Sequence, residues 1–335
     1  MPRISVIIPV FNAAPYLRRC LDSVLNQSLR EIEVVCVDDG SNDASAAILS
    51  EYGVQDNRVL IIAQPNLGQG AARNHGLDVS VGEYVYFMDA DDELADSDAL
   101  ARLVEVMEHD SLEVLLFDAE IQIDHGVDVE GHKLRSDSYI RRRDYSAVRM
   151  GRGLFADMVR DGTFLVSPCL VLLRRSLIEE HHSRFPSARI FYEDNIFMTR
   201  VLLAAERVSH RPWRLYLRKV HADSTVTSKP TLRHLRGYLT CYHDACSLLE
   251  RPEWDRRTRA ALVDRRIIYK LHVRRMVEAH PELVAEMKRE FAGESAQLET
   301  VLNYPIGEKI VNAFRCLRDR GLVFMVKRVL FGRQS

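Results

Sequence analysis

The sequence predicts an α/β protein whose central sheet is mostly parallel and flanked by helices. Three observations support this class: apolar runs of strand length, a helical pattern after most of these runs, and acidic clusters directly after the predicted strand ends. Near-continuous apolar runs imply that both faces of the sheet are covered, as in parallel sheets. The predicted strands of the first half are residues 4–10, 33–37, 59–63, 83–88 and 112–117.

The connecting segments predict the helices in turn. Asn12 to Pro15 has the cap and first-turn chemistry of a helix that runs to about Leu25. The later helical patterns are 44–52, the segment opened by Gly68, 97–108, a stretch from 150, and a helix that starts near 193. Shorter strands are predicted at 170–173 and 214–219.

The chain is expected to divide near residue 228. Residues 1–228 would form the α/β domain, with halves 1–117 and 118–228. Asp118 to Asp144 is polar and is predicted to be an extended excursion over the sheet. From Pro230 the pattern is helical, so 229–335 is expected to be a helical C-terminal appendage.

Composition and charge exclude several classes. The 335 residues are 47% hydrophobic and 28% charged, which excludes disorder as the main state. Lys and Arg number 46 against 48 Asp and Glu, and the formal net charge of -2 predicts no nucleic-acid partner. No apolar run is as long as the about 18 residues that a membrane-spanning helix needs. The start of the sequence, Met1-Pro2-Arg3 and a short apolar run, does not have the pattern of a signal peptide. We therefore expect a cytoplasmic protein.

Acidic residues gather after the predicted strand at 83–88. Asp89, Asp91 and Asp92 would repel one another unless a cation compensates their charge. Carboxylates together with phosphate oxygens form the all-oxygen shell that Mg²⁺ or Mn²⁺ prefers. Ligands of parallel sheets lie beyond the carboxyl ends of the strands, so the position favours a metal site over a solvated acidic turn.

A glycine-rich turn, Gly68-Gln69-Gly70, opens a predicted helix. Arg73 replaces the third glycine of a dinucleotide-binding pattern, and the turn follows the third strand, so a nicotinamide or flavin site is not expected. Backbone donors at the helix start and the charge of Arg73 favour an anion such as phosphate. A plain loop is the alternative.

Four motifs, taken together, resemble glycosyltransferase family two, in the order of that family. They are Val6–Asn12, Val37–Asp43, Asn66–Gly76 and Asp89–Asp92. The resemblance implies the GT-A nucleotide-diphosphosugar transferase fold over roughly 1–225, with a nucleotide-binding half before residue 118 and an acceptor-binding half after it. It also implies an inverting, metal-dependent enzyme that uses a UDP-sugar and Mn²⁺ or Mg²⁺, of the bacterial polysaccharide type.

The resemblance assigns roles to residues of these motifs. Asp39 would accept from a uracil N–H, and Arg73 would flank the base or the diphosphate. Asp91 would be the direct metal ligand, with Asp92 as the alternative. The expected nucleotide-binding residues are Pro9, Val10, Asn12, Asp39, Arg73, Asp89 and Ala90.

A second acidic centre follows in the segment Phe191–Phe197, which resembles the family's acidic pair at a helix start. Alone, Glu193 and Asp194 would be read as acids that complement a helix dipole. The resemblance implies that Asp194, with Glu193 beside it, is the general base. Attack and departure on opposite faces of the sugar would invert the anomeric centre.

Tyr216–Ser224 resembles the family's segment after the last strand. It implies that His221 reaches the metal or the diphosphate, although a lone His in a polar loop is often a surface residue. Arg218 and Lys219 occupy adjacent strand positions and face opposite ways, so at most one of them is expected to reach phosphate.

The function implied is transfer of one sugar from a UDP-sugar to a hydroxyl of a saccharide or lipid-linked saccharide in bacterial cell-surface polysaccharide synthesis. A nucleotidyltransferase, a DxD-type phosphatase and a non-catalytic nucleotide-sugar binding protein are the alternatives. Residues 312–333 are basic and amphipathic, which predicts peripheral contact with the inner face of the cell membrane. Packing of this segment on the core is the alternative.

Overall fold

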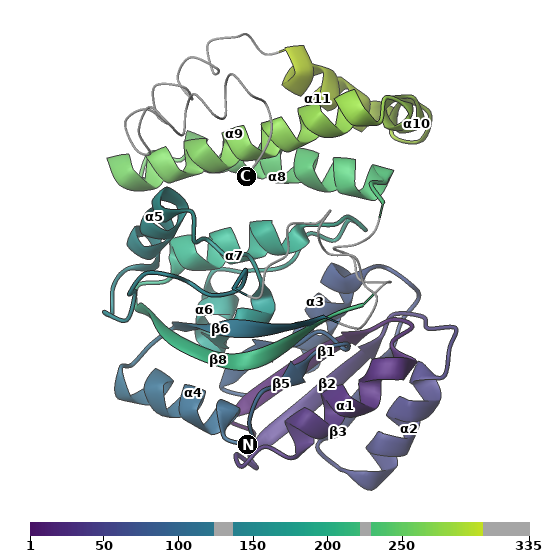
Figure 1. The fold of residues 1–335 in the computed structure, drawn as a ribbon, viewed down its shortest axis with the longest axis vertical. Helices are drawn as coiled ribbons and strands as arrows, with labels where there is room; N and C mark the ends of the chain where they lie inside the picture. Colours follow the sequence, from purple (N-terminus) through teal and green to yellow (C-terminus); the bar gives the residue numbers. More distant parts are fainter. Residues whose placement is uncertain (124–136, 222–228, 304–335) are drawn as a thin grey trace. The chain divides into compact units, whose positions relative to one another are not determined.

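The structure, a computed structural model, describes residues 1–123, 137–221 and 229–303. Its described strands form an eight-stranded sheet with the order β3-β2-β1-β4-β7-β6-β8-β5 (Figure 1). The strands are β1 (Ile4–Val10), β2 (Ile32–Asp38), β3 (Val59–Ala63), β4 (Tyr84–Phe87), β5 (Glu93–Leu94), β6 (Val114–Ile123), β7 (Val171–Arg174) and β8 (Val208–Val220). The predicted α/β class is confirmed.

Parallel pairing dominates the first half of the sheet. Strand β1 runs parallel to both β2 and β4, and β2 runs parallel to β3. Strand β7 is inserted antiparallel between β4 and β6, while β6 and β8 are parallel and β5 is antiparallel to β8. The carboxyl ends of β1, β2 and β4 therefore meet at one edge of the sheet.

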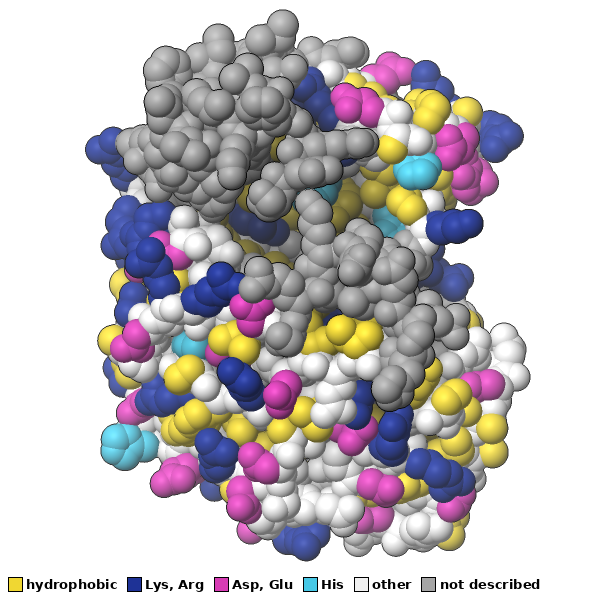
Figure 2. All heavy atoms as spheres, in the orientation of Figure 1, with side chains coloured by type: hydrophobic (Ala, Val, Ile, Leu, Met, Phe, Trp, Pro, Cys, Tyr) yellow, Lys and Arg dark blue, Asp and Glu magenta, His cyan; other side chains and the backbone are white. Residues whose placement is uncertain are grey.

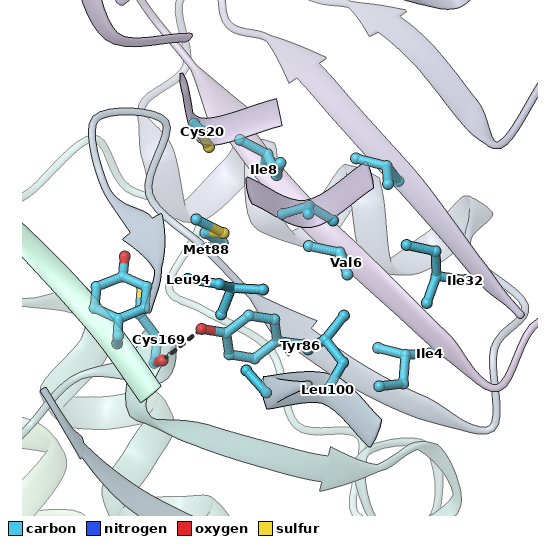
Figure 3. Close-up of a cluster of buried hydrophobic side chains, with 14 of the residues drawn as sticks. Ile4, Val6, Ile8, Cys20, Ile32, Tyr86, Met88, Leu94, Leu100 and Cys169 are labelled. Carbon is cyan, nitrogen blue, oxygen red and sulfur yellow. Dashed lines mark hydrogen bonds between the residues drawn. The ribbon is translucent and has the colours of Figure 1, made fainter. Parts of the chain in front are cut away.

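Helices cover both faces of this sheet (Figure 1). Those of the first unit are α1 (Ala14–Leu25), α2 (Ser45–Gln55), α3 (Gln69–Val79), α4 (Ala99–His109), α5 (Gly151–Asp161), α6 (Arg175–Glu180) and α7 (Glu193–Ala204), with the 3₁₀ turn η1 at Pro168–Leu170. The even-numbered apolar residues of β1 pack in one core cluster with α1, α2 and α4. Figure 3 shows this cluster, in which the Tyr86 hydroxyl donates to the backbone oxygen of Cys169 over 3.1 Å.

The opposite face carries α3 and an aromatic cluster that reaches from the sheet to α7. The rings of Phe185 and Phe197 stack with centroids 4.0 Å apart, and Phe87 of β4 meets both rings edge-on. Gly76 lets α3 approach β1, because a side chain there would collide with Ile7. This packing fixes α7, which begins with Glu193, against the end of β4.

Two predictions about the second half need correction. Residues 118–123 are not an excursion but the second part of β6, where Asp118 is buried by side-chain partners that a sequence pattern does not reveal. The strand expected at 214–219 is the end of a longer strand, β8, which begins at Val208. A β-bulge between β6 and β8 contains Pro212, which has no N–H for the ladder and obscures the strand pattern.

The chain divides into two compact units. The first comprises Met1–Lys229 with Asp255–Thr258, and the second comprises the remainder from Pro230. The helices after the first unit's sheet are α8 (Leu232–Glu250), α9 (Arg256–Ala279), α10 (Glu282–Glu290) and α11 (Ala292–Asn303). Within the second unit, Arg236 on α8 makes a two-nitrogen contact with Glu294 on α11, at 2.7 and 2.8 Å.

Surface charge agrees with the near-neutral composition. On the face of the first unit drawn in Figure 2, acidic and basic side chains are interspersed. Among the described residues, no helix has both the length and the apolar character needed to cross a bilayer. The predicted membrane-contact segment at 312–333 lies outside the described residues.

Candidate active site

The acids predicted to hold a metal lie together beyond the end of β4. Asp89, Asp91 and Asp92 follow the strand directly, and one carboxylate oxygen of each lies within 4.8 Å of the others. We call these three residues the acidic cluster. Carboxylates at this spacing can share a divalent cation, whose charge would offset their mutual repulsion.

Asp92 is the buried member of the acidic cluster. Its Oδ2 accepts from the Tyr216 hydroxyl over 2.7 Å, and its Oδ1 accepts from the Lys219 backbone N–H over 2.7 Å. Burial, followed by the charge of Asp91, raises the pKa of Asp92 well above its ordinary value. Both oxygens therefore already hold β8 against the loop after β4.

Asp91 is the most exposed member of the cluster. Its side chain is 33% exposed, and its Oδ2 lies 3.0 Å from Nε2 of His221. The His221 ring stacks on Tyr16 of α1 with centroids 4.4 Å apart. The structure thus brings His221 to the acidic cluster, and Ala90 is buried next to it.

Arg73 connects the two acidic motifs. Its Nη2 donates to Oδ1 of Asp89 over 2.7 Å, and its Nη1 donates to Oε1 of Glu193 over 3.0 Å. Burial disfavours ionisation of Asp89, but Arg73 and then Arg218 outweigh it, so the pKa of Asp89 is below its ordinary value. Arg73 is 2% exposed, and its guanidinium also lies over the Phe185 ring, with its carbon 5.3 Å from the ring centre.

Asp194 lies in the first turn of α7 and is partly buried. Its Oδ1 accepts from the backbone N–H of Asn195 over 2.8 Å and from the Asn195 amide over 3.1 Å. Burial, and then the negative charge of Glu193, raise the pKa of Asp194 to about 7. A carboxyl group with this pKa can accept a proton near neutral pH, which is what a general base requires.

Glu193 is placed differently from Asp194. Its side chain is 1% exposed, and Oε1 accepts from Gln69 over 2.6 Å as well as from Arg73. A Cβ on Gly70 would lie 3.0 Å from Cγ of Glu193. The second glycine of the glycine-rich turn therefore makes room for Glu193.

Asp39 occupies the anion position of the glycine-rich turn. Its Oδ1 accepts from the Leu67 backbone N–H over 2.8 Å and from the Gln64 amide over 2.7 Å, and its Oδ2 accepts from the Gly68 N–H over 2.9 Å. Gly68 has φ +94°, a conformation that favours glycine. Asp39 thus binds the backbone N–H groups of the two residues directly before α3.

The end of β1 is joined to the loop after β2. Asn12 donates its backbone N–H to Ser41 Oγ over 3.0 Å, and its Oδ1 accepts from the Asn42 N–H over 2.8 Å. Val10 is buried in β1, and Pro9 is partly buried. The predicted nucleotide-binding residues Pro9, Val10 and Asn12 therefore lie at the same sheet edge as the acidic cluster.

Arg218 and Lys219 face opposite ways, as their adjacent strand positions predict. The Arg218 guanidinium carbon lies 5.0 Å from the centre of the Tyr139 ring, and Lys219 Nζ lies 3.1 Å from Glu93. Burial opposes the charge of Arg218, but Tyr139, Asp92 and Asp89 raise its pKa above the ordinary value. Arg218 is thus the one of the two that neighbours the acidic cluster.

The residue patterns missed several residues of this site, among them Gln69, Asn195, Tyr16 and Tyr139. Gln69 and Asn195 stand beside predicted residues, so their amides were available as candidates. Tyr16 and Tyr139 carry no local signal, since one lies in an ordinary helix and the other in a polar segment. Only the packing of distant segments brings these rings to His221 and Arg218.

The sequence matches one protein family over more than half its length. The profile described as Glycosyl transferase family 2 matches residues 5–181. The putative glycosyltransferase EpsH of Bacillus subtilis (strain 168) is 33% identical over 227 residues, which are 67% of this chain and 63% of EpsH. The chain thus spans less than two thirds of that relative.

A second relative and a solved structure agree with this match. The Campylobacter jejuni protein named GalNAc(5)-diNAcBac-PP-undecaprenol beta-1,3-glucosyltransferase is 26% identical over 247 residues, or 71% of this chain and 72% of that protein. S. aureus TarS 1-349, solved in complex with UDP-GlcNAc, aligns with a TM-score of 0.68 at 20% identity, over 100% of this chain and 93% of that one. This likeness confirms the expected GT-A fold.

Proposed function

The chain belongs to glycosyl transferase family 2, and from this premise we propose that it transfers a sugar from a UDP-sugar to a hydroxyl of a saccharide or lipid-linked saccharide. The observation that carries the proposal is the bridge of Arg73 from Asp89 to Glu193. Arg73 holds the acidic cluster, which is suited to bind a cation, near the start of α7, where Asp194 is suited to accept a proton. Sugar transfer from a nucleotide diphosphate needs both functions.

The acidic cluster fits Mn²⁺ or Mg²⁺. Asp91 has an accessible carboxylate with His221 beside it, whereas both oxygens of Asp92 hold hydrogen bonds, so we propose Asp91 as the direct ligand. Bound there, the cation would supply positive charge that stabilises the departing diphosphate. Arg218 adds a fixed positive charge beside the same acids.

Asp194 is proposed as the general base. Asn195 orients one of its oxygens through two hydrogen bonds, and its pKa of about 7 gives a substantial ionised fraction at neutral pH. The carboxylate would take the proton of the acceptor hydroxyl as the new bond forms, on the face opposite to the departing diphosphate. The anomeric centre would therefore be inverted.

Glu193 is assigned a supporting role. It accepts from Gln69 and Arg73, and its charge contributes to the raised pKa of Asp194. We therefore place Glu193 behind the base rather than in contact with the acceptor.

Donor and acceptor are proposed from the relatives. TarS was solved with UDP-GlcNAc, which favours a UDP-sugar as the donor. The name of the Campylobacter relative specifies a saccharide joined to undecaprenol through diphosphate, which favours a saccharide or lipid-linked acceptor in cell-surface polysaccharide synthesis. Contact of residues 312–333 with the inner face of the membrane stays a prediction from the sequence.

Calorimetric titration with UDP, GDP and CMP, each with and without Mn²⁺, tests the donor class. We expect UDP to bind tightest and its affinity to depend on the metal. Release of UDP from a panel of UDP-sugars, with saccharide and lipid-linked acceptors, then tests transfer, and NMR of the product gives the anomeric configuration. Retention of configuration, or metal-independent UDP binding, would contradict the proposal.

The base is tested by Asp194→Asn. The amide cannot take a proton, so turnover should fall by about 10²-fold or more, while UDP affinity stays within twofold. Asp78→Asn is the matched control, because this exposed carboxylate on α3 pairs with Arg184 away from the acidic cluster. Full turnover of Asp194→Asn would refute the assignment.

A further inference from the structure

A buried cluster of charged and polar side chains joins β6, β8 and the segment at 139–141. Oδ1 of Asp118 accepts from Arg141 Nη1 over 3.0 Å and from His210 Nε2 over 3.0 Å. Arg141 Nη1 also donates to the backbone oxygen of Phe117 over 2.6 Å. We call Asp118, Arg141 and His210 the anchor cluster; each of the three is 3% exposed or less.

The anchor cluster is a poor device for stability alone. Oδ2 of Asp118 and the Nε and Nη2 atoms of Arg141 are buried without a hydrogen-bond partner. Burial also lowers the pKa of Arg141 below its ordinary value. Incompletely bonded buried ion pairs gain little or no net free energy over apolar packing. The anchor cluster is therefore better explained by the defined geometry that it gives to the segments it joins.

The anchor cluster fixes the chain around Tyr139. The Arg141 backbone N–H lies 3.3 Å from Oδ1 of Asp118, and the Ala119 N–H donates to the Tyr139 carbonyl over 3.2 Å. Residues 139–141 are thus attached to β6 at two successive positions. The attachment leaves the Tyr139 ring next to Arg218, on the neighbouring strand β8.

The Tyr139 phenol is influenced by charges of both acidic motifs. The pKa of the Tyr139 phenol is raised above its ordinary value, chiefly by burial. The charge of Arg218 opposes this rise, whereas the charges of Asp92, Asp194 and Asp89 add to it. The ring therefore lies within electrostatic reach of acids from both motifs. Nε of Arg218 is buried without a hydrogen-bond partner, so the face of Tyr139 is a principal contact of this guanidinium.

We propose that Tyr139 is a positioning residue that holds the Arg218 guanidinium beside the acidic cluster, and that the anchor cluster fixes Tyr139 in this place. The inference rests on the proposed function, because a cation held there serves the departing diphosphate. Tyr139 acts through Arg218: its ring provides the π face that orients and shields the cation. Arg141, the first basic residue of the 141–143 run, acts one step further away.

Substitutions of Tyr139 test the contact, with affinities for UDP and UMP measured by calorimetry in Mn²⁺. Tyr139→Leu keeps an apolar side chain but removes the π face, and it should weaken UDP binding about fivefold or more, as expected for loss of a partly buried cation–π contact. UMP, which lacks the second phosphate, should bind with little change. Tyr139→Phe retains the π face and should restore UDP affinity to within twofold.

Tyr52→Leu is the matched control. The Tyr52 ring also lies beneath an arginine, Arg18, with the guanidinium carbon 5.9 Å from its centre, but on α2. Its melting temperature should fall while UDP affinity is retained. An equal loss of UDP affinity in Tyr52→Leu and Tyr139→Leu would overturn the inference, because general loosening would then explain both.

Double variants test whether Arg141 acts through Tyr139, and Tyr139 through Arg218. In the Arg218→Gln background, Tyr139→Leu should cause no further loss of UDP affinity, and in the Tyr139→Leu background neither should Arg141→Met. Additive losses would overturn the inference. UDP that fails to bind the unaltered chain would refute the proposed function and this inference together. UDP that binds the unaltered chain and Tyr139→Leu equally would refute this inference alone.

Discussion

Arg73 Nη1 donates to Oε1 of Glu193 over 3.0 Å, in an ion pair whose side chains are 3% and 1% exposed. The other terminal nitrogen of Arg73 holds Asp89 over 2.7 Å. One guanidinium therefore joins the loop after β4 to the start of α7. The planar fork of arginine suits this double contact, which a lysine ammonium on a flexible stem cannot reproduce with the same geometry.

Arg73→Lys should accordingly lose both stability and turnover. A lysine can satisfy one acid and leaves the other as a buried charge, so we expect a loss of about 3 kcal/mol in the free energy of unfolding and a large fall in turnover. Urea unfolding and UDP release measure the two effects. Arg184→Lys, whose partner Asp78 is exposed, should change neither. Unchanged stability of Arg73→Lys would contradict the bridging role.

The pH dependence of activity should reflect Asp194. Since its pKa is about 7, the base is mostly protonated below that pH, and turnover should rise as the pH rises through about 7. The test is a pH–rate profile at saturating UDP-sugar. A profile that is flat from about one pH unit below this pKa to about one unit above it would contradict the assignment.

Ionisation of Asp194 should lower the stability of the fold as the pH rises, although it raises turnover. A pKa raised in the folded state means that the folded chain retains a proton that the unfolded chain releases above about pH 4. Its contribution to the free energy of unfolding should therefore fall as pH rises from about 4 to about 7. Asp194→Asn should lack this fall, which urea unfolding at several pH values will detect.

Asp91 and Asp92 should respond differently to the same substitution. Asp91→Asn removes charge from an accessible carboxylate, so it should weaken Mn²⁺-dependent UDP binding and leave the melting temperature nearly unchanged. Asp92→Asn replaces one of two buried acceptor oxygens with a donor, so it should lower the free energy of unfolding by about 1–3 kcal/mol. Calorimetry and thermal unfolding distinguish the two. The reverse pattern would make Asp92 the metal ligand.

Two glycines in helices should give opposite effects when changed to alanine. A Cβ on Gly70 would lie 3.0 Å from Cγ of Glu193, which is held by Gln69 and Arg73 and cannot yield freely, so Gly70→Ala should destabilise the fold and reduce turnover. A Cβ on Gly153 in α5 meets nothing within 4 Å. Gly153→Ala should therefore stabilise the fold by about 0.5–1 kcal/mol. Thermal unfolding compares them, and a stabilised Gly70→Ala would show that Glu193 can move.

The predictions from sequence were most accurate where a local pattern carries the information. The apolar runs located β1, β2 and β3 to within about one residue at each end, and the acidic cluster was found because three acids follow one strand. The predictions failed where burial depends on a distant partner. Asp118 lies in a strand although it is an acid, because Arg141 pairs with it there and His210 lies within hydrogen-bond distance.

The amino-acid sequence by itself determined the α/β class, the strand ends that carry acids, and the motifs of the family. Periodicity and turn chemistry act between neighbouring residues, so they can be read without a structure. Only the tertiary structure decided that Arg73 joins Asp89 to Glu193, that Asp92 is held by Tyr216, and that Tyr139 covers Arg218. These pairs unite segments far apart in the chain, and the order and packing of the strands, rather than any local pattern, bring them into contact.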